Sequence, residues 1–201
     1  MESVGVPERA VVRSSSAHRG DGTDDDRFRR ALIAIGVTAA VAVLAGWLPA
    51  PATLTIAAMV PPAMIDARTR RLPDGWIGIA AGVLATALAL AWMSGTPPAS
   101  GSTAAGAVAM ALPLLVLHLW SPRSMGFGDV KAALVLGAAL GTIAWQLGLV
   151  AACVAAGVGA GAGLARRSST IAFGPFLVAG AAIALVWSEL GLGTVLNGSG
   201  A

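Results

Sequence analysis

Long apolar stretches joined by short loops limit this chain to a membrane environment. Residues 31–65 contain no charged side chain, and the stretch 130–165 contains only Lys131. A single membrane-spanning helix needs about 20 predominantly apolar residues. Charged residues make up 11% of the chain, against about 25% in soluble domains, which is too few to cover a water-facing surface. The sequence therefore predicts an all-α, polytopic membrane helix bundle.

Both long stretches exceed one crossing and have basic residues at each flank, which the positive-inside rule places in the cytoplasm. Each stretch is therefore predicted to form a hairpin of two helices. The first hairpin turns at residues 49–51, and Pro61-Pro62 is expected to kink its second arm. The second hairpin turns at Gly141-Thr142. The bundle then has about seven transmembrane helices, at residues 31–48, 52–66, 75–93, 103–120, 129–141, 143–165 and 171–187.

The positions of the basic and tryptophan residues agree with this topology. All thirteen Lys and Arg residues lie in the N-terminal tail, in predicted cytoplasmic loops or at cytoplasmic helix ends, so the N-terminus is predicted to be cytoplasmic. All six Trp residues lie near predicted helix ends, where the indole ring prefers the membrane interface. Residues 1–26 are polar and are predicted to form a disordered cytoplasmic tail before one transmembrane domain, residues 27–201.

Nucleic acid, metals and cofactors are not expected as partners. The net charge of +3 comes from basic residues in short loops beside apolar runs, where they favour topology over phosphate binding. Cys153 is the single cysteine, so the chain forms no internal disulfide and no CxxC zinc site. His18 lies in the polar tail, and His118 ends an apolar helix at the expected interface. Nothing in the sequence indicates an oligomeric state.

Two acidic residues occur directly at the ends of predicted helices. Six of the ten acidic residues are in the tail, Asp74 is in a loop, and Glu189 follows the last helix, which leaves Asp66 and Asp129. The predicted topology places both carboxyl groups near the cytoplasmic leaflet. Two carboxyl groups that meet at one depth cannot both ionise, so they supply one acid and one base around a shared water. This is the chemistry that peptide hydrolysis without a metal or a protein nucleophile requires.

Other interpretations of these two residues remain open. Asp129 begins a helix, where the helix dipole stabilises a negative charge, whereas Asp66 ends one, where the dipole opposes it unless Arg68 or Arg70 compensates. The dipoles therefore favour Asp129 as the base and Asp66 as the acid, although titration belongs to the pair. The pair would also suit a non-enzymatic transporter or assembly subunit that binds an ion. No acidic residue lies in the outer halves of the predicted helices to form an ion path.

Glycines surround Asp129 and recur later in the chain. Gly126 and Gly128 are predicted to permit unusual backbone geometry and the close approach of an extended substrate. The small-residue spacing in the run 157–163 predicts close helix packing.

Three segments resemble one protein family. The GxGDxK pattern at residues 126–131 is similar to that of the type IV prepilin peptidases, which are bacterial GxGD membrane aspartyl proteases. The basic loop after Asp66 ends in Leu72-Pro73-Asp74, where the family has Ile-Pro-Asn. The segment 172–176, Ala-Phe-Gly-Pro-Phe, resembles the family's Pro-Phe-Gly-Pro-Phe. Together these segments cover roughly residues 55–190, in the family's order.

The resemblance implies an endopeptidase that removes the short basic leader from type IV prepilins or pilin-like proteins. The cut would follow a glycine and precede an apolar helix, at the cytoplasmic face of the bacterial plasma membrane. Asp66 and Asp129 would be catalytic. A related GxGD peptidase for archaeal preflagellins or signal-peptide remnants is the alternative substrate class. Longer relatives carry a region with two CxxC pairs and methylate the new N-terminus, so this chain resembles a short, peptidase-only form.

The remaining candidate residues have two interpretations each. Lys131 and Arg68 either meet an acidic substrate residue or enforce topology, and topology is favoured. Phe173, Gly174 and Pro175 either line the site or simply begin the last helix, with Pro175 in its first turn.

Overall fold

The computed structural model describes Gly46, residues 49–69, Leu72, and residues 74–121, 126–166 and 172–190. These residues form six helices and no strand, which confirms the all-α prediction. The helices are α2 (Ala50–Thr69), α3 (Asp74–Met93), α4 (Ser100–Trp120), α5 (Phe127–Gly141), α6 (Gln146–Arg166) and α7 (Gly174–Glu189). The predicted helix 31–48 and the tail 1–26 lie outside the described residues.

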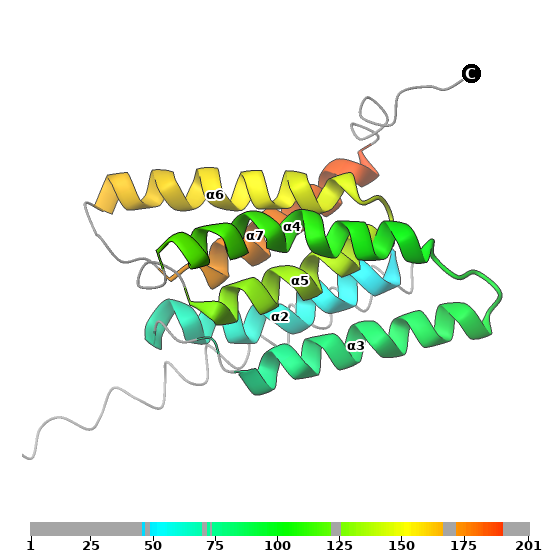
Figure 1. Cartoon of the computed structure of the whole chain (residues 1–201). Helices are drawn as coiled ribbons and strands as arrows, with labels where there is room; N and C mark the ends of the chain where they lie inside the picture. The colour runs from blue at the N-terminus through cyan, green and yellow to red at the C-terminus, as the bar shows by residue number, and fades with distance from the viewer. Residues whose placement is uncertain are drawn as a thin grey trace, which may run out of the picture.

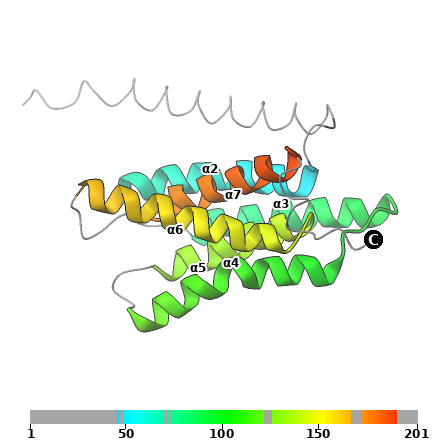
Figure 2. The same cartoon turned by 90° about the horizontal axis from the view of Figure 1, so that it is seen from above.

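The helices run alternately up and down in one bundle (Figures 1 and 2). α2, α4 and α6 end at the left of Figure 1, where α3, α5 and α7 begin. We call this the Asp end of the bundle, because Asp66 lies in the last turn of α2 and Asp129 in the first turn of α5. α5 stops at Gly141, the turn that the sequence predicts. α2 is longer than expected, because it begins at Ala50 and continues past Asp66 to Thr69.

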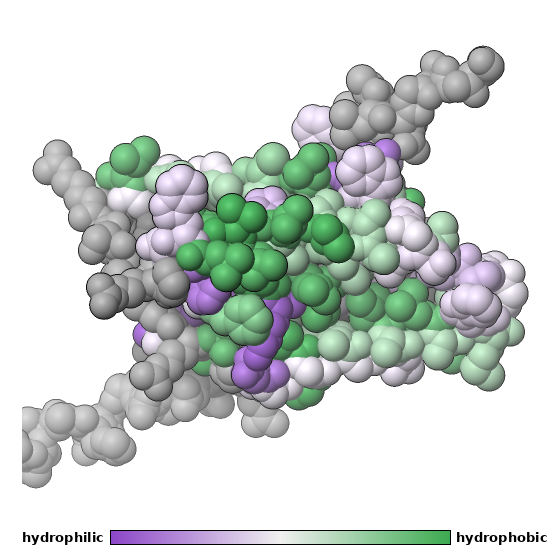
Figure 3. Space-filling view, in the orientation of Figure 1, coloured by the Kyte–Doolittle hydropathy of each residue, from purple (hydrophilic) through white to green (hydrophobic). Residues whose placement is uncertain are grey.

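The chain is a membrane protein. Four of the described helices, namely α2, α3, α4 and α6, are long and apolar enough to cross a membrane, and α7 is apolar but shorter. Large apolar side chains are exposed along the bundle, including Leu119 and Leu164. Hydrophobic residues cover much of the face seen in Figure 3, and the strongest hydrophilic colour lies towards the Asp end. The count of seven crossings and the cytoplasmic N-terminus remain predictions.

α5 is the central helix of the described bundle. It contacts each of the other five helices, and ten of its 15 residues are buried. A 15-residue helix is only about 22 Å long, less than the roughly 30 Å of a bilayer's hydrocarbon core. This length is acceptable because the surrounding helices, rather than lipid, cover most of α5. Its first turn, which carries Asp129, is therefore held among protein side chains.

Glycines let α4, α5 and α6 approach backbone to backbone. A Cβ added at Gly106 would lie 2.6 Å from the carbonyl oxygen of Gly137, and one added at Gly148 would lie 2.5 Å from the carbonyl oxygen of Gly106. Side chains at these positions would force the helices apart. The run 157–163 was expected to provide such packing, and for Gly157 and Gly161 this prediction is wrong. An added Cβ at either position would meet nothing within 4 Å, because both residues are on the exposed side of α6.

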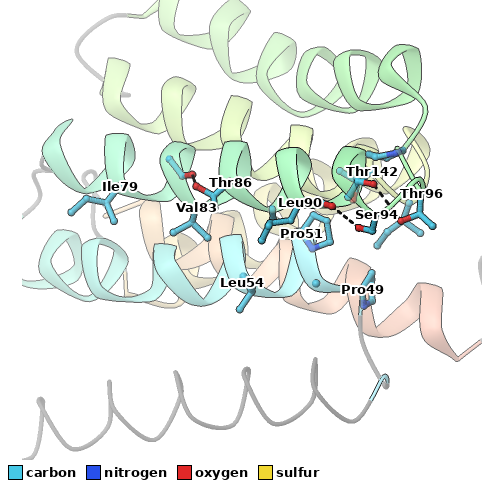
Figure 4. Close-up of a pocket in the computed structure, with 16 residues that line it drawn as sticks. Pro49, Pro51, Leu54, Ile79, Val83, Thr86, Leu90, Ser94, Thr96 and Thr142 are labelled. Atoms are coloured by element: carbon cyan, nitrogen blue, oxygen red, sulfur yellow. Dashed lines mark hydrogen bonds between the residues drawn. The ribbon is translucent and has the colours of Figure 1, made fainter.

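An apolar cavity of about 830 Å³ lies between α2, α3 and the turn after α5 (Figure 4). Its lining includes Leu54, Val83 and Leu90, and none of the lining residues that the structure describes is titratable. On α2 the lining stops at Leu54, twelve residues before Asp66, or about 18 Å along the helix. Neither Asp66 nor Asp129 lines the cavity.

Candidate active site

Asp66 is buried, with 5% of its surface exposed, in the last turn of α2. The backbone N–H of Gly174 donates a hydrogen bond of 2.9 Å to Asp66 Oδ2. Gly174 is the first residue of α7, so the Asp66 carboxyl group lies against the start of another helix. The local sequence around Asp66 or Gly174 does not indicate this contact, because 108 positions separate the two residues.

This contact changes the electrostatic argument about Asp66. The sequence places its carboxyl group at the C-terminus of α2, where the dipole opposes a negative charge. The structure also places it at the N-terminus of α7, where the backbone N–H of Gly174 and the positive dipole end stabilise an anion. The premise that only Asp129 benefits from a helix N-terminus is therefore wrong. Helix dipoles no longer assign the base to Asp129 and the acid to Asp66.

Asp129 is the third residue of α5 and is 9% exposed. Its own N–H donates to the carbonyl oxygen of Gly126 at 3.1 Å, and a backbone hydrogen bond from Gly126 reaches its carboxyl group. This is half of a capping box, in which a side chain at the third helical position returns to the backbone before the helix. The start of α5 thus fixes the direction of the Asp129 side chain.

Asp66 and Asp129 form a pair at the Asp end. Among the described residues they are the two buried charged side chains. α2 and α5 contact each other, and the two carboxyl groups are near enough for electrostatic repulsion between them. Two acids that the sequence separates by more than sixty positions therefore share one buried region. Because burial of ionisable groups in a membrane protein costs free energy, the pair is the candidate functional site.

The room left by a missing side chain, rather than unusual backbone geometry, explains why the two residues near the start of α5 are glycines. Gly126 has φ −72° and ψ 141°, which any residue adopts, and Gly128 lies within α5, so the prediction of unusual geometry is wrong. A Cβ at Gly126 would lie 3.6 Å from Asp129 Oδ2, and one at Gly128 would lie 3.3 Å from Leu72 Cβ. The glycines keep the region beside the carboxyl group open and allow the α2–α3 connection to approach.

Lys131 points away from Asp129. The two residues are two positions apart on a helix, which separates their side chains by about 200°. Lys131 Nζ instead lies 3.1 Å from Asp74 Oδ2 at the start of α3, and 5.4 Å from the centre of the Phe127 ring. The lysine therefore joins α3 to α5 at the surface. Arg68 is exposed in the last turn of α2, also two positions from the acid of its own helix.

The segment before α7 is held by aromatic packing. A Cβ added at Gly159 would lie 3.0 Å from the Phe173 ring, so this glycine of α6 makes room for that side chain. The rings of Phe173 and Phe176 lie 6.3 Å apart. Pro175 occupies the first turn of α7, as the sequence predicts. Gly174 donates a hydrogen bond to a carboxyl group, and Phe173, which precedes it, packs against the apolar core.

Leu72 is a site residue that sequence reasoning missed. A Cβ added at Gly174 would lie 2.8 Å from Leu72 Cδ1, and one added at Gly128 would lie 3.3 Å from Leu72 Cβ. This single side chain thus contacts the starts of both α5 and α7. The available signal was its position within the segment Leu72-Pro73-Asp74, which aligns with one of the resembled motifs.

Fold and site together define a helical membrane protein with two buried carboxyl groups at one end of its bundle. The comparison with protein families is more specific. A model of the type IV leader peptidase family matches residues 53–161, more than half of the chain, and this range contains both Asp66 and Asp129. The chain belongs to this family and is a leader-peptidase-like protease. Comparisons with curated proteins and with solved structures found no match.

Proposed function

We propose that the chain is a membrane-embedded aspartyl endopeptidase that removes the short basic leader from type IV prepilins or pilin-like proteins. Cleavage takes place at the cytoplasmic face of a bacterial plasma membrane, which is where the predicted topology puts the Asp end. Residues 27–201 form the transmembrane peptidase domain. The lipid bilayer and the leader-bearing protein are its partners, and its chemistry uses no cofactor.

The observation that carries the proposal is the pairing of Asp66 and Asp129. Both residues are buried, they come from helices in contact, and they interact electrostatically. Both also lie within the range that matches the leader peptidase family. A merely interfacial aspartate has no reason to be buried beside another carboxyl group, because like charges repel and burial penalises both.

The pair hydrolyses a peptide bond with water as the nucleophile. One carboxylate accepts a proton from the water while the water oxygen attacks the carbonyl carbon of the scissile bond. The other carboxyl group is protonated, because two close carboxyl groups do not both ionise, and it donates its proton to the leaving amine. The C–N bond then breaks to release the leader and a new N-terminus. A backbone amide holds each carboxyl group, namely Gly174 for Asp66 and Gly126 for Asp129.

The test replaces each carboxyl group by an amide of the same shape. Asp66→Asn and Asp129→Asn are each co-expressed with a pilin that carries a basic leader, a glycine and an apolar helix. The mass of the pilin N-terminus reports cleavage. Each variant is expected to lose leader removal by at least about a thousandfold, because acid and base act as a unit.

Asp74→Asn is the matched control. Asp74 is also an aspartate at the Asp end, but its side chain is 71% exposed and pairs with Lys131. This control is expected to keep cleavage within about threefold of the unsubstituted protein, as for most exposed ion pairs. Full cleavage by either buried-aspartate variant refutes the catalytic pair. An unchanged pilin mass with the unsubstituted protein, in a membrane where it is folded, points instead to a different substrate class or a non-enzymatic protein.

A further inference from the structure

Leu72 stands in the connection between α2 and α3, close in sequence to Asp66. It is partly buried and packs against the apolar core of the bundle. The connection leaves α2 after Thr69 and begins α3 at Asp74. Leu72, the described residue of this connection, thus contacts the bundle at the Asp end with an apolar side chain.

The Leu72 side chain lies between two glycines that belong to different helices. Its Cδ1 would be 2.8 Å from a Cβ on Gly174, at the start of α7. Its Cβ would be 3.3 Å, and its carbonyl oxygen 3.6 Å, from a Cβ on Gly128 in the first turn of α5. Carbon atoms in contact normally lie about 3.5–4.0 Å apart. The side chain therefore occupies space that exists because both positions lack a Cβ.

Each glycine is directly linked to one of the carboxyl groups. Gly174 donates its N–H to Asp66 Oδ2, and Gly128 immediately precedes Asp129 in α5. Leu72 therefore lies between the starts of α5 and α7, and each start is linked to one of the two carboxyl groups.

We propose that Leu72 is a positioning residue, which holds the two carboxyl groups at the separation that hydrolysis requires. This inference rests on the proposed function. The Leu72 side chain has no polar atoms and takes no part in the proton transfers. It contacts the glycines beside the two acids. The competing explanation is that Leu72 only fills space and stabilises the fold. The two explanations differ in kinetics, since loss of positioning lowers kcat and alters its dependence on pH.

The experiment compares three variants in membranes with the pilin substrate described above. Leu72→Ala removes Cδ1, which faces Gly174, and keeps the Cβ and carbonyl oxygen that face Gly128. Leu72→Met keeps a side chain of similar volume. Leu88→Ala is the matched control, because Leu88 is another partly buried leucine that packs against the same core but belongs to the second half of α3, away from the Asp end. The measurements are kcat, KM, the pH profile of kcat and thermal unfolding.

Leu72→Ala is expected to lower kcat at least about tenfold, to change KM by less than about threefold and to shift the pH profile. Leu72→Met should restore kcat to within about threefold, and Leu88→Ala should keep the pH profile of the unsubstituted enzyme. The proposal is overturned if Leu72→Ala retains kcat and its pH profile, or if Leu88→Ala shifts that profile equally. If Leu72→Ala does not fold, Leu72→Val is judged by the same criteria.

Two results separate this inference from the proposed function. Full cleavage by Asp66→Asn or Asp129→Asn refutes the catalytic aspartate pair of the proposed function. If those variants are inactive but the Leu72 series follows the control, the peptidase stands and the positioning residue does not.

Discussion

Because Gly174 donates a hydrogen bond to Asp66, the substitution Gly174→Ala, which adds one methyl group, tests the site directly. In Gly174→Ala the new Cβ would lie 2.8 Å from Leu72 Cδ1, 2.9 Å from Asp66 Oδ2 and 3.3 Å from Asp66 Cβ. The end of the leucine side chain can rotate away at little cost. Asp66 can avoid the methyl group only by turning its carboxyl group away from the N–H of Gly174, or by moving α2 away from α7.

Either movement breaks the 2.9 Å hydrogen bond, because an N···O distance beyond about 3.5 Å no longer counts as one. A hydrogen bond to a charged group contributes about 1.5–3 kcal/mol. Since about 1.4 kcal/mol corresponds to a tenfold change in rate, misplacement of Asp66 should lower kcat/KM for leader removal by about 10- to 100-fold. The variant should still fold, because α2 and α7 also contact each other elsewhere along their length.

The assay follows leader removal over time in membranes by the mass of the substrate N-terminus. Thermal unfolding in detergent shows whether Gly174→Ala is folded. Gly157→Ala is the control, because it adds the same methyl group to another helical glycine where nothing lies within 4 Å. A folded Gly174→Ala that cleaves within about twofold of Gly157→Ala would refute the reasoning, because Asp66 would then not depend on this hydrogen bond.

Three further outcomes follow from the same contacts. Gly137→Ala should lower the free energy of unfolding by about 2 kcal/mol or more, because its Cβ would meet the backbone of α4. Gly157→Ala should change it by less than about 1 kcal/mol. Equal unfolding temperatures for the two variants would contradict this prediction. Lys131→Met should cost less than about 1 kcal/mol, since its ion pair with Asp74 is exposed, and a double-mutant cycle of the pair measures that coupling. Gly126→Ala should leave unfolding unchanged but slow leader removal, because its methyl group would lie 3.6 Å from Asp129 Oδ2; unchanged cleavage would show that this space is unused.

Helix positions were predictable because hydropathy and the placement of basic residues are local signals. The turn at Gly141, the start of α3 at Asp74 within one residue, and Pro175 in the first turn of α7 all agree with the sequence. The predicted start of α2 is too late, because the prediction treats Pro49-Ala50-Pro51 as a turn, although proline is tolerated in a helix's first turn. The hydroxyl of Thr53 also bonds to the carbonyl oxygen of Pro49 there.

Contacts between helices were less predictable. Spacing alone marked Gly157 and Gly161 as packing residues, but it does not show which side of α6 faces the bundle, and both are exposed. The tight contacts involve Gly106 and Gly137 instead, where two helices approach from different parts of the chain. In the same way, the sequence identified Asp66 but not Gly174 as its partner, because that hydrogen bond exists only once α7 lies beside α2.

The use of backbone amides to hold both carboxyl groups explains why glycines surround the site. At Gly174, whose N–H lies 2.9 Å from Asp66 Oδ2, an added Cβ would collide with Asp66 itself. A helix start supplies such N–H groups in a fixed direction, because its first amides have no partner within the helix. A lysine or arginine would bring a full positive charge that keeps both acids ionised. A helix start stabilises a carboxylate more weakly, which leaves one acid free to carry the proton that the leaving amine requires.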